Sequence, residues 1–505
     1  MNSVSQAPAR ISVILYLFVM VALFAAFALP AHAQFTLQKI SIDQFTNSDS
    51  VHRTEVEPAT FASGSTIVSA FQVARRPGNI GWGSADIGFA TSTNGGITWS
   101  FGYLPGLTVN YKNGPYYGAA DPSVAYDSKH GVWLISSLPL INPIGDVAVS
   151  RSNDGLHWSN PVIIDSTHND DKNWTVCDNT PSSPYFGNCY TEWDAATSTG
   201  FVEMSTSRDG GKTWTPGATT ADHAGGLGGQ PLVQPNGNVV VPFTNYFGNY
   251  SFTSTDGGKT WGQTVTIVAA IDSHADAGGI RNPNLPSAEI DSAGKLYVLW
   301  ADCRFRKNCA ENDVVMSTSA DGNSWSKPVR IPIDPTTSTV DHFIPGIGID
   351  HSTGGSGAHI TIVYYYYPVS SCGNSCQLDV GFTTSQDGGQ TWTAGQKIAG
   401  PMQLSWLPVS DLGPMVADYI HVSYTNGNPF GVFAAATAPN GGVLNEAMYT
   451  TKQPLLALGD VPRFSSKSDE MVAGAKSDHV MKGYYDDEGR YPIPESKRDQ
   501  GKSQE

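Results

Sequence analysis

The stretch Ser254-Thr-Asp-Gly-Gly-Lys-Thr-Trp261 decides the fold of this chain, because close copies of it recur along the sequence. The pattern appears six times, and its tryptophans are 47 to 67 residues apart. A repeat of this length suits one four-stranded antiparallel sheet with loops of varying size. Many glycines and prolines, 53 and 32 respectively, agree with short strands joined by tight turns. The sequence therefore predicts an all-β fold, a single β-propeller of four-stranded antiparallel blades.

The recurring motif has the composition of a hairpin turn. Its acidic side chain can accept backbone N–H groups, its glycines can adopt positive φ, and its Trp can pack beneath the turn. None of these roles is catalytic. We therefore expect the third position of each copy to be structural; these positions are Asn94, Asp154, Asp209, Asp256, Asp321 and Asp387.

The motif resembles the Asp-box, or bacterial neuraminidase repeat, which occurs in sialidases and in other β-propellers. The resemblance implies that each box lies between the third and fourth strands of a blade. It also implies that the boxes lie on the face opposite the active site. Six copies in residues 92–392 make the resemblance specific for architecture.

The number of blades depends on a seventh unit that carries no box. This unit comprises two β-rich runs, 418–424 and 431–436. With the six boxes it favours seven blades. In the alternative, six-bladed arrangement, it completes the first blade together with a strand near residues 35–42. The propeller is expected to span residues 34–451, followed by a flexible polar tail over 452–505.

The first 33 residues have the features of a secretory signal peptide. Arg10 precedes an apolar run over 11–29, and Ala31-His-Ala33 suits cleavage before Gln34. An uncleaved membrane anchor is the alternative. No membrane span is expected in the mature chain, which is predicted to be secreted or periplasmic.

Charge and cysteine content fit that compartment. The formal net charge of −16 argues against nucleic acid as a partner. The six cysteines form three pairs close in sequence, and in an oxidising space we expect them to be disulfides rather than zinc ligands. The expected pairs are Cys177 with Cys189, Cys303 with Cys309, and Cys372 with Cys376.

Candidate site residues come from the inner-strand starts and from the loops joining second and third strands, because these segments meet at one face of a propeller. Several arginines among them could bind a carboxylate. The resemblance implies three carboxylate-binding arginines, a Tyr nucleophile activated by a Glu, and an Asp acid. The candidate catalytic residues are Arg281, Arg304, Asp302, Tyr365, Glu192 and Asp86. The candidate substrate-binding residues are Arg75, Arg76, Trp82 and Asp121.

The sequence also departs from the sialidase pattern. The Phe-or-Tyr-Arg-Ile-Pro signature that supplies the first arginine is absent before the first box, and Arg330-Ile-Pro332 follows the fifth box instead. Purely structural roles are the alternative to catalytic ones. Arg304 could form a surface salt bridge with Asp302, and the tyrosines of 364–367 could pack within the sheet. Two functions therefore stay open: a glycosidase of sialidase-like or two-carboxylate type, and a non-catalytic propeller that binds glycans or proteins.

A binding module would need aromatic platforms rather than arginines. The candidates are Trp82, Tyr116, Tyr117 and Trp406. The fold requires no cofactor. Calcium is a further hypothesis, because four acids at inner-strand starts could form a ring of carboxylates; these are Glu57, Asp121, Asp171 and Asp418.

Overall fold

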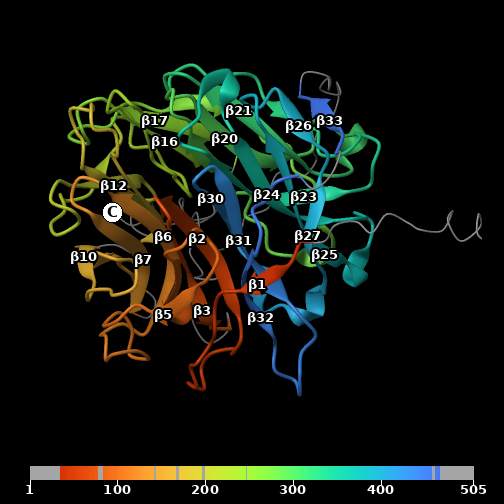
Figure 1. Cartoon of the computed structure of the whole chain (residues 1–505), viewed down its shortest axis with the longest axis horizontal. Helices are drawn as coiled ribbons and strands as arrows, with labels where there is room; N and C mark the ends of the chain where they lie inside the picture. Colours follow the sequence, from red (N-terminus) through yellow and green to blue (C-terminus); the bar gives the residue numbers. More distant parts are fainter. Residues whose placement is uncertain are drawn as a thin grey trace, which may run out of the picture. The chain divides into compact units, whose positions relative to one another are not determined.

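The strands of this protein fall into antiparallel sets of four, each made of segments that are consecutive or nearly so in sequence (Figure 1). The computed structural model describes residues 35–77, 83–141, 144–166, 170–195, 199–245, 247–457 and 461–466. The expected signal peptide and Trp82 lie outside the described residues. No helix in the described part of the chain is long and apolar enough to cross a bilayer.

Two sets are joined in one nine-stranded sheet through a single residue pair, Ser84 with Ala119. The first set contains β2 (Glu55–Ser63), β3 (Thr66–Arg75), β4 (Ser84–Ser92) and β5 (Ser100–Tyr103). The second contains β6 (Gly118–Asp127), β7 (Val132–Ile141), β9 (Val147–Ser152) and β10 (Val162–Asp165), with the short β8 (Ile144–Gly145) on β7.

Four more sets form separate sheets. The third has β11 (Asp171–Cys177), β12 (Cys189–Asp194), β13 (Val202–Ser207) and β14 (Ala218–Thr219). The fourth has β15 (Leu232–Val233), β16 (Val239–Thr244), β17 (Asn249–Ser254) and β18 (Val265–Val268). The fifth has β19 (Ser287–Ile290), β20 (Leu296–Asp302), β21 (Asp313–Ser319) and β22 (Val329–Arg330). The sixth has β23 (Asp341–Ile349), β24 (Ile360–Tyr367), β25 (Gln377–Ser385) and β27 (Gln396–Gln403).

The last set joins both ends of the folded chain. It contains β30 (His421–Thr425), β31 (Asn428–Ala436) and β32 (Glu446–Thr451), and β1 (Leu37–Lys39) pairs with β32. The strand expected near residues 35–42 thus pairs with the unit that lacks a box, whereas the first box-bearing unit has four strands of its own. Pairing of the first strand with the last unit closes the fold.

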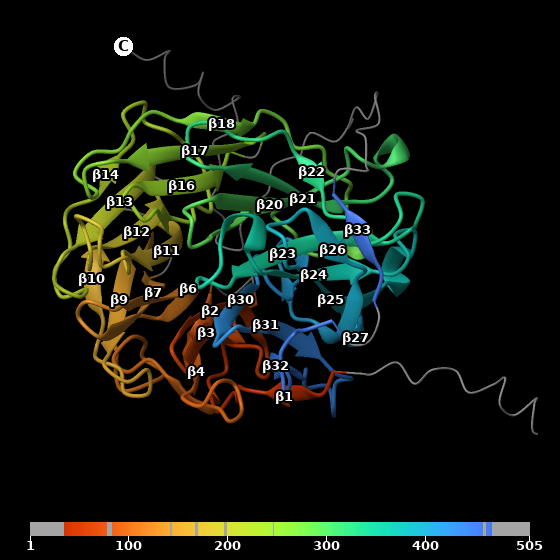
Figure 2. The same ribbon diagram turned by 45° about the horizontal axis from the view of Figure 1, so that its top comes forward.

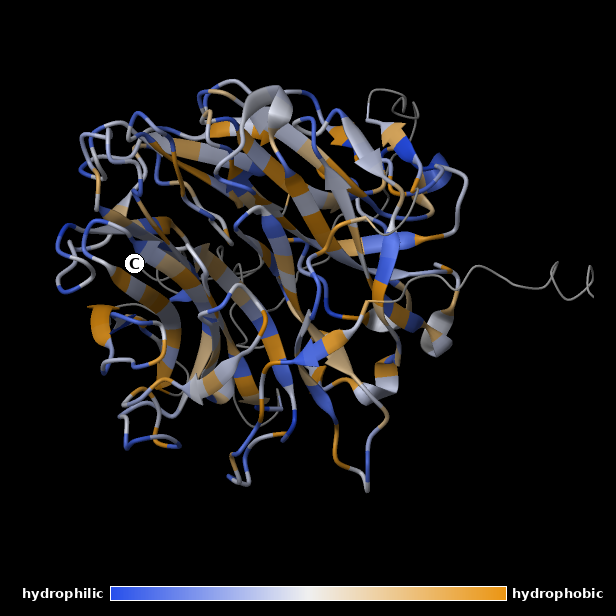
Figure 3. Ribbon diagram, in the orientation of Figure 1, coloured by the Kyte–Doolittle hydropathy of each residue, from blue (hydrophilic) through white to orange (hydrophobic). Residues whose placement is uncertain are grey.

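The first strands of successive sets contact one another in order, from β2 to β6, β11, β15, β19, β23 and β30, and β30 contacts β2 (Figure 2). The sets are therefore arranged in a closed ring with these inner strands at its centre. Hydrophobic residues lie mainly on the strands (Figure 3). The apolar clusters pack between neighbouring sets, and one of them joins Leu299 of β20 to Ile347 of β23.

Short elements complete the chain. The 3-10 helices are η1 (Ala277–Gly279), η2 (Lys307–Cys309), η3 (Gly355–Gly357), η4 (Gly373–Ser375) and η5 (Leu404–Trp406). Two small sheets pair β26 (Thr391–Thr393) with β33 (Arg463–Ser465), and β28 (Val409–Ser410) with β29 (Gly413–Pro414).

Each box lies after the third strand of its set, and Asp256 illustrates its role. Its Oδ1 accepts the backbone N–H groups of Lys259 and Thr260 at 3.0 Å each, and its Oδ2 accepts the Thr260 hydroxyl at 2.7 Å. Gly257 and Gly258 adopt φ of 73° and 74°, a region that only glycine enters at little cost. The box is a turn held together by its own carboxylate.

The inner strands share a second recurring feature, a β-bulge near their start. Glu57, Asp121, Lys172 and Ile344 have φ between 39° and 57°, which is uncommon for residues other than glycine. The strand register shifts at each of these positions. A bulge changes the direction in which a side chain points. In β2, β6 and β11 the bulge lies at an equivalent position near the start of the strand, and the residue there is charged.

The segment expected to form a flexible tail begins inside the fold. Leu455 is fully buried, and Phe464 of β33 pairs with Trp392 of the sixth box. The expected boundary at residue 452 is therefore wrong for the segment up to Ser466, because an apolar side chain and a strand at this point complete the sixth and seventh sets. Residues 467–505 lie outside the described residues.

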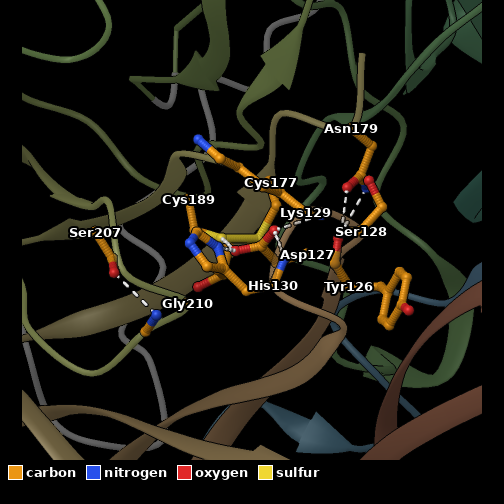
Figure 4. The surroundings of a disulfide bond; sticks show 12 residues. Tyr126, Asp127, Ser128, Lys129, His130, Cys177, Asn179, Cys189, Ser207 and Gly210 are labelled. Carbon is orange, nitrogen blue, oxygen red and sulfur yellow. Dashed lines mark hydrogen bonds and ion pairs between the residues drawn. A yellow bond between two sulfur atoms is a disulfide. The ribbon is translucent and has the colours of Figure 1, made fainter. Parts of the chain in front are cut away.

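The three expected disulfides are confirmed. Cys177 and Cys189 are directly paired residues of β11 and β12, so this bond fastens the ends of two neighbouring strands (Figure 4). Asp127 lies against it, with Oδ2 3.7 Å from Cys189 Sγ and 2.6 Å from Nδ1 of His130. In the described residues no cysteine is free.

Candidate functional site

Nine buried charged side chains gather around the starts of the inner strands. We call them the charge cluster: Glu57, Arg75, Asp121, Asp171, Lys172, Glu192, Asp194, Arg281 and Asp418. The bulges of β2, β6 and β11 place three of them, and strand pairing places two more, since Asp171 pairs with Asp194 and Trp174 with Glu192. Six carboxyl groups face three basic groups in this cluster, so it is acidic.

Arg281 and Asp418 form the strongest ion pair of the cluster. Arg281 Nε donates to Asp418 Oδ1 at 2.6 Å, and Nη2 donates to Oδ2. Arg281 precedes β19, and Asp418 precedes β30, so the pair links the fifth and seventh sets. Such a two-point bond fixes both side chains and strengthens the interaction.

Glu57 sits beside this pair in a chain of hydrogen bonds. Gln72 Nε2 donates to Glu57, and Arg75 Nη1 donates to Gln72 Oε1 at 2.8 Å. Burial raises the pKa of Glu57 well above its usual value, and the charges of Asp121 and Asp418 raise it further. The raised pKa favours the protonated form of Glu57.

Lys172 provides the positive charge on the other side. It is buried, its Nζ lies 3.5 Å from the ring centre of Tyr419 and 4.8 Å from that of Trp174, and it has no hydrogen-bond partner among the described residues. Burial raises the pKa of Asp121, and Lys172 opposes the rise. Contact with the faces of two aromatic rings stabilises the ammonium group at this buried position.

Glu192 and Asp194 complete the cluster on β12. Glu192 Oε1 accepts the backbone N–H of Gly229 at 3.2 Å, and its Oε2 has no partner among the described residues. Burial raises the pKa of both carboxyls, the charge of Glu192 raises that of Asp194, and Lys172 opposes both shifts. Carboxyls with raised pKa values thus lie close together, and acid–base catalysis uses carboxyls whose pKa values are shifted by their surroundings.

The expected site residues divide into two groups. The structure brings Arg75, Asp121, Glu192 and Arg281 into the charge cluster. Arg304 instead donates to both oxygens of Asp302, at 2.8 Å and 2.6 Å, and to the carbonyl of Ala270.

Two other expected residues are held by separate partners. Arg76 binds Asp49 and two backbone carbonyls, and stacks on Tyr117 at 3.7 Å. Asp86 is fully buried and accepts hydrogen bonds from Thr108 and from the backbone of Ile87. Their polar atoms are committed to these contacts.

Tyr365 lies in the core rather than in the cluster. It is fully buried, and its hydroxyl donates to the carbonyl of Ala434 at 2.8 Å. Burial raises its pKa well above the usual value, the opposite of what an activated phenol nucleophile needs. We therefore leave Tyr365 out of the site proposed below.

Sequence reasoning missed Lys172 and Gln72 as site residues, and also a carboxyl pair beside the cluster. Lys172 occupies the bulge position that Glu57 and Asp121 occupy in their strands, and this equivalence is the signal that could have identified it. In the carboxyl pair, Asp276 is hydrogen-bonded to Asp341, and burial raises the pKa of Asp276 to about 6.

Calcium fits the cluster poorly. Arg281 already binds Asp418 with two hydrogen bonds, and Lys172 lies among the remaining acids, so two basic side chains supply the charge that an ion would bring. A second acidic group contains Asp313, Asp334 and His342.

In that second group, too, basic side chains occupy the positions that a cation would take. Arg306 contacts Asp313 at 2.6 Å and Asp334 at 3.0 Å, and Arg330 contacts both as well. Arg330, the arginine of the misplaced Arg-Ile-Pro sequence, is thus part of a buried ion-pair network.

Comparison with known proteins agrees with the repeats. Residues 144–344 match the BNR repeat-like domain. None of the curated proteins matches the chain. Among solved structures, the NanB sialidase of Streptococcus pneumoniae is similar with 13% identity and a TM-score of 0.39, covering 82% of this chain and 70% of that one.

Two other similar structures have different activities. An ulvan lyase of polysaccharide lyase family 25 has 10% identity and a TM-score of 0.47, covering 83% of this chain and 96% of that one. An α-L-arabinofuranosidase from Podospora anserina has 12% identity and a TM-score of 0.36, covering 70% and 97% respectively. The six boxes and the matched segment 144–344 agree that this chain contains BNR repeats.

Proposed function

We propose that this protein is an exported glycoside hydrolase that uses carboxyl groups of the charge cluster as acid and base. The observation that carries the proposal is the proximity of buried acids with raised pKa values to the ion-paired Asp418 at the starts of the inner strands. Asp121, which shares a hydrogen bond with Glu57, is the general acid. Asp418, held by Arg281, is the carboxylate that stabilises positive charge developing on the sugar.

The charge of the cluster indicates the class of glycan. Burial raises the pKa of Glu57, Glu192 and Asp194 and so favours their neutral forms, and the other three carboxyls balance the three basic groups. The cluster then has no surplus of positive charge for an anionic sugar, and we propose a neutral glycan as substrate. An exo-sialidase remains the second candidate, favoured by the Asp-boxes and by Arg281. It would require Arg281 and Arg304 to leave Asp418 and Asp302 and bind one sugar carboxylate together. A glycan-binding propeller without catalysis is the third arrangement.

Hydrolysis of 4-methylumbelliferyl glycosides tests the proposal. The panel holds neutral sugars and a sialoside, and the variants are Asp121→Asn and Glu57→Gln. We expect neutral-sugar turnover that falls at least 100-fold in Asp121→Asn, as loss of a general acid predicts. The matched control is Asp379→Asn, another buried carboxyl that pairs with Lys397 outside the cluster; it should stay within twofold of the parent.

Each other outcome overturns the proposal in a distinct way. Turnover of the sialoside alone, lost in Arg281→Ala and Arg304→Ala, would establish the sialidase candidate instead. Binding of a glycan array without any turnover would establish the binding candidate. Equal activity in Asp121→Asn and the parent would remove the charge cluster from the mechanism.

We also propose that the four-stranded sets are the blades of a seven-bladed propeller and that the chain is exported. The closed circuit of contacts from β2 to β30 supports the first point, and the three disulfides support the second. Mass spectrometry of the mature protein tests export. A mass that begins at Gln34 is expected, and a chain that keeps Met1 in the cell would contradict it.

A further inference from the structure

A pocket of about 340 Å³ lies among the inner strands beyond the charge cluster. Its lining includes Phe61, Tyr126 and Trp174 together with three groups able to bind metal, Glu289, His351 and His421. Tyr126 and Glu289 lie near the carboxyl ends of β6 and β19, whereas the charge cluster lies near the amino ends of the inner strands. None of the functions argued above uses this pocket.

Both histidines present Nε2 to the same carboxylate. Nε2 of His351 lies 3.0 Å from Oε2 of Glu289, and Nε2 of His421 lies 3.9 Å from Oε1. Two ligand atoms bound to one zinc ion at about 2.1 Å each are separated by about 3.4 Å in tetrahedral geometry. The two observed separations lie on either side of that value.

His421 is oriented as a metal ligand. Its Nδ1 lies 2.8 Å from the carbonyl oxygen of Thr60, so the backbone holds this side of the ring while Nε2 faces Glu289. Histidines that bind metals commonly donate their other N–H to a backbone carbonyl in this way.

The side chain of His351 can adjust its position. The side chain of His351 is 50% exposed, whereas those of His421 and Glu289 are 9% and 13% exposed. One ligand atom from each of the three groups does not yet lie within 4.8 Å of the other two, so an ion bound by all three requires rotation of this exposed imidazole. Since all six cysteines are in disulfides, no thiolate of the chain competes for a soft metal.

We propose that Glu289, His351 and His421 bind a divalent transition metal of the zinc class in the central pocket. Two imidazoles and one carboxylate are ligands that zinc prefers, and the open side of the pocket leaves a fourth position for water. The site differs from the Asp313–Asp334–His342 group, where Arg306 and Arg330 supply the positive charge. It is independent of the proposed hydrolase activity.

Zinc titration by calorimetry tests this site, with the purified chain free of any histidine tag. We expect one zinc per chain, at least tenfold weaker binding in His421→Gln and Glu289→Gln, and weaker binding in His351→Asn. His351→Asn changes an exposed side chain and should not disturb folding. The control is His157→Asn, since His157 is an exposed histidine 2.7 Å from a single carboxylate, Asp154; it should bind zinc as the parent does.

Cobalt provides a second readout. Tetrahedral Co²⁺ bound to the parent should give visible absorption bands that His351→Asn and His421→Gln lose. The proposal is overturned if the parent binds no zinc, if the His421 and Glu289 variants retain the parent affinity, or if His157→Asn weakens binding as much as they do.

Discussion

The boxes and the charge cluster use the same residue type in opposite ways. In the boxes, aspartates at turns accept several hydrogen bonds; for Asp256 burial tends to raise the pKa, but the Thr260 hydroxyl and backbone N–H groups outweigh it, and the pKa is lowered. In the cluster, carboxyls such as Glu57 and Asp194 are fully buried with few donors, and the pKa is raised. Burial, opposed by the N–H and O–H donors around each carboxyl, decides the direction in which its pKa shifts.

This contrast separates stability from function in the fold. A box carboxylate accepts its hydrogen bonds from the backbone of its own turn and therefore needs no ligand. Five of the six boxes have Asp at this position. A buried carboxyl that keeps a proton is costly to the fold and is retained where chemistry needs it. The comparison therefore predicts different responses to substitution in the two regions.

The largest effect is expected at Lys172. In Lys172→Met, the acids around it lose their buried cation, and breaking a buried charge network costs about 3–5 kcal/mol. We expect denaturant unfolding to show a loss of that order. Lys397→Met is the control, because Lys397 pairs with Asp379 but is 41% exposed; its loss should be below about 1 kcal/mol. Equal losses in the free energy of unfolding would mean that Lys172 stabilises the fold no more than the partly exposed Lys397 does.

The pH dependence of stability should have opposite signs in the two regions. Asp276, beside the cluster, has its pKa raised by burial from 3.8 to about 6. Between these values the unfolded chain releases a proton that the folded chain keeps, so stability falls as pH rises from about 4 to about 6. The box aspartates have lowered pKa values, so their contribution is lost only as pH falls below about 4.

Melting temperatures of the parent and Asp276→Asn, measured from pH 4 to pH 7, test this difference. The variant cannot titrate at this position, so its stability should fall less over the window, by an amount on the order of 2 kcal/mol. If both proteins lose stability in parallel, Asp276 does not hold a proton in the folded state.

A smaller effect is expected when a box loses its acceptor. Asp256→Ala leaves the N–H groups of Lys259 and Thr260 without their carboxylate, and losses at comparable turn and cap positions are about 1–2 kcal/mol. Glycosidase activity per folded molecule should be unchanged, because the box is remote from the cluster. A large loss of activity at unchanged stability would give the box a functional role that its geometry does not indicate.

The boxes were predictable because the turn is local: all its donors and its acceptor lie within eight consecutive residues. The disulfides were predictable for the same reason, since each joins cysteines close in sequence. The cluster was predicted only in part. Arg281 meets Asp418 across 137 positions, and no periodicity indicates which inner strands face each other.

Two expectations, one from loop position and one from composition, meet single contacts that the sequence pattern does not indicate. The position of Arg304 in a second-to-third-strand loop suggested a substrate site, yet Asp302, two residues away, binds it first. The polar composition after residue 452 suggested a tail, yet one buried Leu455 and one short strand fix it to the sixth and seventh sets. Composition averages over a segment, whereas a single contact determines where the folded part ends.

The smallest loss of stability is expected when the carboxylate of a box is replaced by an amide. This substitution tests whether the charge of the box side chain or its shape stabilises the turn. The first box carries Asn94, whose Oδ1 accepts the N–H of Thr98 at 2.9 Å while its Nδ2 donates to the Thr98 hydroxyl at 2.8 Å. An amide can therefore replace the carboxylate if the threonine hydroxyl reverses its role. Asp256→Asn should then cost about 0.5 kcal/mol or less, well below Asp256→Ala. Comparable losses in the two variants would show that the negative charge, rather than the shape of the acceptor, holds these turns together.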